Sequence, residues 1–147
     1  MLRVSKLTDY ATVVMTTLAQ ADEAVVSALA VAQRAQLEPP TVAKLLKLLA
    51  HAGLVNSQRG AGGGYRLARA AREITVADIV EAIEGPFGMT ECSVHDGLCG
   101  YEHHCGVRSN WRRISAAIGE ALRGVTLADM TSPPAPRAII PVRIALS

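Results

Sequence analysis

The chain has 147 residues and a formal net charge of +2; half of its residues are hydrophobic and only five are aromatic. This length predicts a single domain, and the aliphatic composition favours helices over an all-β sandwich. No apolar run approaches the roughly 18 residues that span a bilayer. The first residues lack the apolar segment of a signal peptide, so we expect a cytoplasmic protein.

The near-neutral total conceals three blocks of charge. Residues 1–72 carry nine Lys/Arg and four Asp/Glu, residues 73–107 carry seven acids and no Lys or Arg, and residues 108–147 carry six bases and two acids. The basic first block is typical of a surface that binds a polyanion. The acidic block contains all three cysteines, and this odd number indicates a thiol or metal site rather than a secreted disulfide framework.

The apolar spacing of the basic block predicts three helices. They span about 7–20, with Thr8 as the candidate cap, 28–36 behind Ser27, and 39–52 with Leu48 on the buried side. Gly53 then supplies a left-handed stop.

Two short strands follow, at 54–57 and 65–68, separated by the glycine cluster 60–64. Alternating residues on either side of such a cluster predict a β-hairpin.

The rest of the chain predicts more helices. Thr75 and Asp78 form a capping box that opens a helix ending at Gly85. We expect a loop over 86–106, a long helix over 107–124, a short helix from 126, and a tail from 133. The fold class is therefore mainly α with a small β-hairpin: a winged helix-turn-helix over 1–72, a cysteine loop and dimerisation helix over 73–131, and a tail over 132–147.

Three helices and a glycine-tipped hairpin make a winged helix-turn-helix, whose third helix enters the major groove of DNA with its N-terminus. An arginine beside glycines suits a narrow minor groove and close backbone approach. We expect double-stranded operator DNA to contact Pro40, Thr41, Lys44, Lys47, Arg59, Gly60, Gly62, Gly63 and Tyr65. The alternative is a helix-turn-helix used only for protein packing. A phosphate-binding loop is disfavoured because no Gly-Lys-Ser/Thr follows the glycines.

Cys92, Cys99 and Cys105 have the spacing C-x6-C-x5-C. This spacing matches neither a zinc knuckle nor a ferredoxin, and it leaves open an iron–sulfur cluster, a zinc site, a thiol redox switch or inert cysteines. Nearby candidates for a fourth ligand are Glu91, His95, Glu102, His103 and His104. A cysteine nucleophile beside a loop histidine lacks any orienting motif, so we do not expect an enzyme.

The long helix carries apolar residues that step by four and three positions in alternation. This spacing is typical of a coiled coil. The residues expected at the dimer interface are Val107, Trp111, Ile114, Ile118, Ala121 and Val125.

Three segments together, 5–11, 53–65 and 91–111, resemble the winged-helix iron–sulfur regulators typified by the Isc cluster-assembly regulator and the nitric-oxide-sensing repressor. The closest likeness is to the branch that regulates the SUF iron–sulfur assembly operon. The resemblance covers roughly residues 1–131. It implies a homodimer with the long helices crossed at the interface, and an iron–sulfur cluster held by Cys92, Cys99 and Cys105.

The fourth ligand is where this sequence departs from part of that family. In the Isc branch it is a histidine three residues after the last cysteine, where this chain has Arg108. In the nitric-oxide branch an N-terminal acid of the partner subunit completes the site, and Asp9 matches that position. The resemblance thus implies Asp9 as a ligand in trans and a [4Fe–4S] or [2Fe–2S] cluster.

The function implied is a cluster-sensing transcriptional regulator that represses iron–sulfur assembly (SUF) genes. The alternative is a zinc- or thiol-dependent regulator of the same fold that responds to nitric oxide or oxidative stress.

Overall fold

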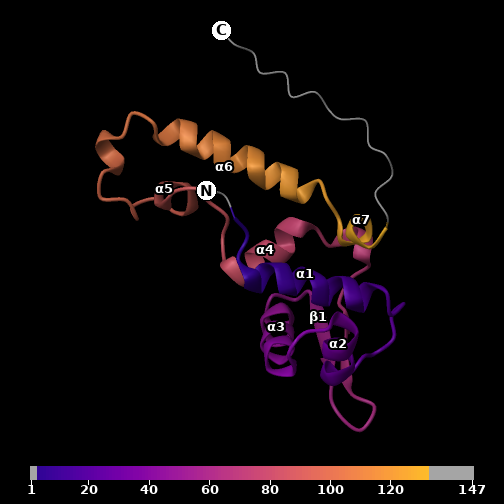
Figure 1. Cartoon of the computed structure of the whole chain (residues 1–147). Coiled ribbons are helices and arrows are strands. Elements are labelled where there is room, and N and C mark those ends of the chain that lie inside the picture. The colour runs from indigo at the N-terminus through magenta and orange to yellow at the C-terminus, as the bar shows by residue number, and fades with distance from the viewer. Residues whose placement is uncertain (1–2, 133–147) are drawn as a thin grey trace.

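A computed structural model describes residues 3–132, so the predicted tail from 133 lies outside the described residues. The chain is mainly helical with one antiparallel hairpin, as predicted (Figure 1). The α-helices are α1 Lys6–Ala19, α2 Ala28–Ala35, α3 Pro39–His51, α4 Val76–Glu84, α5 Glu91–Val94, α6 Arg108–Arg123 and α7 Leu127–Thr131. The strands are β1 Val55–Gln58 and β2 Gly64–Leu67, and the 3-10 helices are η1 Ala71–Glu73 and η2 Glu102–His104.

Helix α1 is the centre of the packing. It contacts α2 and α3, and it also contacts α4 and α7 (Figure 1). Its buried side meets the buried side of α3 in an aliphatic core. The prediction that Thr8 caps α1 is wrong: Ser5 is the N-cap and accepts the Thr8 backbone N–H. Leu48, predicted to be buried, is only half-buried.

The hairpin is joined to the helices by its backbone. Val55 pairs with Leu67 and Gln58 with Gly64, which confirms the predicted hairpin. Val26, just before α2, exchanges two backbone hydrogen bonds with Tyr65, at 2.9 and 2.8 Å. A Cβ atom at Gly64 would collide with the Val26 carbonyl oxygen, so this position needs glycine for close backbone approach. The wing is therefore fixed to the head at its base.

Two capping boxes lie side by side where α4 and α7 begin. Thr75 and Asp78 cap α4, as predicted, and Thr126 and Asp129 cap α7 in the same way. Thr75 and Thr126 form an antiparallel bridge, reinforced by the bond from the Leu127 N–H to the Ile74 carbonyl at 2.7 Å. Ile74 and Leu127 are fully buried in the main core. The core thus continues past residue 72, and the functional division at that position stays a prediction.

Helix α6 lies apart from α2 and α3, beyond α4, with α5 near its first residues and α7 following its last (Figure 1). The prediction of an irregular segment over 86–106 is wrong in part, because α5 and η2 form within it. No helix of residues 3–132 is long and apolar enough to cross a membrane.

Candidate nucleic-acid interface and cysteine loop

The outer side of α3 presents the residues predicted to contact DNA. Pro40, Lys44 and Lys47 are exposed, and Thr41 is half-buried. The opposite side of the helix holds buried aliphatic residues, including Leu45. Proline in the first turn has no N–H that the helix must satisfy, so α3 begins where the sequence predicts. The helix therefore offers its N-terminal half and two lysines to a partner.

The wing tip carries the predicted Arg59, which is exposed. Gly60 has a φ of 109°, a value that suits glycine, and its carbonyl accepts the Gly63 N–H at 3.0 Å. A Cβ at Gly63 would collide with the Gln58 carbonyl oxygen, whereas Gly62 faces open space. Gly63 is therefore required by the turn itself, and Gly62 is free of that constraint.

A pocket lies between the last turns of α3 and the wing. Three of the residues predicted to contact DNA line this pocket together: Lys47, Arg59 and Tyr65. Its other lining residues are Ala50, His51, Ser57, Gln58 and Gly64. The sequence pattern did not single out His51 or Gln58. The signal for His51 was its spacing of four residues from Lys47, which places both on one helix face.

The three cysteines are free thiols on one loop. Cys92 is 6% exposed, at the start of α5, and its Sγ lies 3.3 Å from Thr90 Oγ1. Cys99 and Cys105 are half-buried. Within residues 3–132 of the single chain, no three His, Cys, Asp or Glu side chains are gathered as a metal site. The predicted ligands therefore share a loop, but this conformation does not bring them together.

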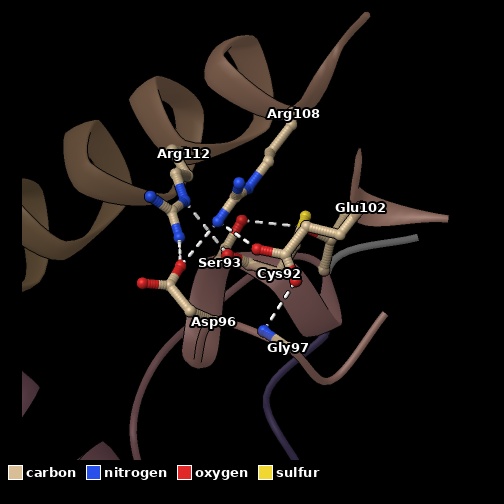
Figure 2. Close-up of polar contacts among 8 residues, drawn as sticks. Cys92, Ser93, Asp96, Gly97, Glu102, Arg108 and Arg112 are labelled. Atoms are coloured by element: carbon tan, nitrogen blue, oxygen red, sulfur yellow. Dashed lines mark hydrogen bonds and ion pairs between the residues drawn. The ribbon is translucent and has the colours of Figure 1, made fainter. Parts of the chain in front are cut away.

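The cysteine loop, residues 86–107, is attached to α6 by polar contacts (Figure 2). Glu102 is 6% exposed; it accepts the Gly97 N–H at 2.6 Å and forms an ion pair with Arg108. Arg108 and Arg112 both pair with Asp96, and Arg112 Nε donates to the Cys92 carbonyl at 3.1 Å. We did not predict a role for Arg112. The signal was its spacing of four residues from Arg108, next to a block without basic residues.

The same contacts perturb the Asp96 carboxyl. Its hydrogen bond and ion pair with Arg112, with a smaller contribution from Arg108, hold the pKa of Asp96 below its ordinary value. The loop also bonds to α6 through the Met89 N–H, which donates to Ser115 Oγ at 3.0 Å.

Asp9 is exposed on α1 in a surface pocket with Arg3, Ser5, Lys6 and Glu84. Beside it, Glu84 accepts the Thr8 hydroxyl at 2.5 Å. Hydrogen bonds from Ser5 and Thr8 lower the pKa of Glu84. The expected role of Asp9 concerns a partner subunit, so it stays a prediction.

The apolar face of α6 predicted for dimerisation is largely uncovered in the single chain. Val107 is 52% exposed, Trp111 38% and Ile114 43%, and Ala121 is also exposed. Ile118 is half-buried, and so is Val125, which lies beyond the end of α6. Exposed large apolar side chains at coiled-coil spacing are typical of a helix that packs against another helix.

Comparison with known proteins found a matching family model over residues 4–133, Rrf2, described as an iron-dependent transcriptional regulator. The transcriptional regulator IscR of Cereibacter sphaeroides is 33% identical over 126 residues, which cover 82% of this chain and 81% of that protein. Protein aau3 of Rhizobium meliloti is 40% identical over 88 residues, but the match spans only 57% of its length and 59% of this chain.

Two solved structures share the fold. CymR, the global cysteine regulator of B. subtilis, superimposes with a TM-score of 0.69 and 34% identity, covering 89% of this chain and 97% of that one. IscR of T. potens gives a TM-score of 0.65 and 38% identity, covering 88% and 85%.

Proposed function

This chain belongs to the Rrf2 family of transcriptional regulators, and from that premise we propose that it is a cytoplasmic, homodimeric repressor of iron–sulfur assembly (SUF) genes. It binds operator DNA and senses an iron–sulfur cluster. The proposal rests mainly on helix α6, which contacts the loop with three free cysteines and is joined at its C-terminal end to the cationic winged head. The proposal is supported by the IscR relative, which is named as a transcriptional regulator, and by the structural neighbour CymR, which is named as the global cysteine regulator.

The DNA contact uses three parts of the head. The first turn of α3 and Lys44 enter the major groove. Arg59 at the wing tip reaches the neighbouring minor groove, where narrow regions attract arginine. A DNA backbone separates the two grooves, so it runs across the pocket that Lys47, His51 and Arg59 line.

The cysteine loop fits a cluster in its donor chemistry. Three thiols are available, and thiolates are the usual ligands of iron–sulfur clusters. Arg108 Nε is the buried side-chain nitrogen that lacks a hydrogen-bond partner within residues 3–132, so a donor remains for a sulfur atom arriving with the cluster. Cys92, Cys99 and Cys105 would hold it, with Asp9 of a second copy as the candidate fourth ligand. The bound cluster supplies a centre that reacts with oxygen and nitric oxide.

The loop influences DNA through α6. Because α6 bears the exposed apolar face, it sets the spacing of the two heads in a dimer. A tenfold change in DNA affinity requires a coupling free energy of only about 1.4 kcal/mol.

The test is anaerobic purification followed by an absorption spectrum, iron and sulfide analysis, and gel shifts of cluster-bound and cluster-free protein on the DNA upstream of its own gene. We expect a coloured protein whose DNA affinity changes when the cluster is removed. The control is a triple Cys→Ser variant of Cys92, Cys99 and Cys105, which should be colourless and insensitive to that treatment.

The same preparation distinguishes the cluster from the alternatives. A colourless protein that contains zinc would favour a zinc-dependent regulator. A metal-free protein whose DNA affinity responds to thiol oxidation would favour a redox switch. Failure of Arg59→Ala to weaken sequence-specific DNA binding would leave only a protein-packing role for the head.

A further inference from the structure

The ion pairs of Arg108 and Arg112 are not used by the DNA-binding or ligand roles above, in which Arg108 contributes only its Nε. We call the four side chains of Asp96, Glu102, Arg108 and Arg112 the arginine clamp (Figure 2). The two arginines lie one turn apart on α6, and the two acids lie on the cysteine loop. The clamp therefore joins two elements that the sequence places in oppositely charged blocks.

The clamp reaches both halves of the loop. Through Asp96 and the Cys92 carbonyl it holds the segment that contains α5, with Arg112 Nε 3.1 Å from that carbonyl oxygen. Through Glu102 it holds the segment between Cys99 and Cys105. The other oxygen of Glu102 accepts the Gly97 N–H at 2.6 Å, which closes the turn between the two segments.

The charges explain why α6 must provide these groups. The cysteine loop contains three acids, Glu91, Asp96 and Glu102, and no Lys or Arg, so no lysine or arginine of the loop can pair with them. Glu102 is nearly buried, and a buried carboxylate without a partner is costly. Arg108 supplies the ion-pair partner that Glu102 needs.

We propose that Arg108 and Arg112 are positioning residues that dock the cysteine loop on α6 before any cluster is bound. The clamp keeps the backbone next to Cys92 and the segment between Cys99 and Cys105 against the same helix. Docking does not depend on the proposed function, but its effect on cluster retention rests on it.

The first test uses cluster-free protein and amide hydrogen exchange. In Arg108→Gln we expect exchange at Gly97 and across 92–105 to become about tenfold faster, because hydrogen bonds to charged groups are lost. The matched control is Arg113→Gln, since Arg113 is exposed on the same helix and forms no ion pair within residues 3–132. The Tyr65 amide in the wing reports on the head and should keep its rate in both variants. Equal loop exchange in Arg108→Gln and Arg113→Gln overturns the proposal.

A second, more conservative variant tests the proposal in case Arg108→Gln does not fold. Arg112→Lys keeps a positive charge for Asp96 but loses the Nε–H that bonds to the Cys92 carbonyl. We expect faster exchange that is confined to α5 and its flanks, with an unchanged circular dichroism spectrum. Exchange in α5 identical to wild type would contradict the role given to Arg112.

The second test measures cluster loss in air from the absorption spectrum. We expect loss to be about tenfold faster in Arg112→Gln than in Arg113→Gln, with Arg112→Lys recovering part of the difference, because Arg112 holds the loop and has no bond to the cluster in this proposal. Equal rates overturn the retention part of the proposal. If the wild type takes up no cluster, the proposed function fails, whereas exchange in the cluster-free protein still decides the docking role.

Discussion

The wing and the cysteine loop are built by different forces. The wing is closed by backbone hydrogen bonds, both within the hairpin and to Val26, and it rests on a core of fully buried aliphatic residues. The cysteine loop contributes one buried cysteine and is held mainly by side-chain charges on α6. This difference means that salt and pH should loosen the loop while leaving the head intact. A rigid head and a loop that can adjust would suit the ligand-controlled regulator proposed above.

The largest effect should come from the core under the head. Leu45→Ala removes a fully buried side chain of α3 and should lower stability by about 2–5 kcal/mol. Calorimetry would detect a lower melting temperature, together with weaker DNA binding. Lys44→Ala, one residue earlier on the exposed side, should keep the wild-type melting temperature. Equal melting temperatures for the two variants would show that the head does not depend on this core.

The wing tip should affect binding without affecting folding. Arg59→Ala should weaken binding to operator DNA by about 1–3 kcal/mol and reduce the salt dependence of the affinity. Fluorescence anisotropy over a range of salt concentrations measures both quantities. Gly62→Ala is a useful companion, because Gly62 faces open space in the chain and its added methyl group tests close approach to DNA. Loss of stability in Arg59→Ala would contradict the separation of binding from folding.

High salt should distinguish the two regions in one sample. At 1 M salt the screening length is about 3 Å, which weakens exposed ion pairs such as those of Asp96. We expect faster amide exchange at His95, which precedes Asp96 in the loop, and little change at Tyr65, in the wing. Equal increases in the exchange rates of both amides would show that the loop is not held by charge any more than the wing is.

The smallest effect should be the pH response of Asp96. Arg112 and then Arg108 lower its pKa in the folded protein, so its contribution to stability is present above the ordinary value of 3.8 and is lost as the pH falls through the folded value. An NMR titration of the carboxyl should give a midpoint below 3.8, and Arg112→Gln should move it back toward 3.8. A wild-type midpoint at the ordinary value would mean that the ion pairs do not persist in solution.

Local signals in the sequence were reliable. The Thr75 capping box, the stop at Gly53 and the hairpin all depend on residues within a few positions, and the structure confirms them. The assignment of Thr8 as a cap was wrong because α1 begins earlier, with Ser5 as its N-cap, which leaves the Thr8 hydroxyl to donate to Glu84, 76 residues away.

The cysteine loop was harder to predict. α5 has only four residues, too few to show a helical period, and the partners of Glu102 depend on how the loop folds onto α6. The residue types of the candidate ligands could be read from the sequence, whereas their distances depend on these long-range contacts.

The paired starts of α4 and α7 give α6 the mechanics of a lever. The end of α6 near Gly124 is anchored to the head by the Val76 N–H bond to the Val125 carbonyl, at 2.9 Å, and by the Leu127 N–H bond to Ile74. The arginines that hold the cysteine loop lie at the opposite end, and a 16-residue helix is about 24 Å long. A tilt of about 5° at the anchor moves that far end by about 2 Å. Movement of the loop by one or two bond lengths therefore corresponds to a small rotation of α6 about its anchored end. In the proposed dimer, this rotation would set the angle between the two DNA-binding heads.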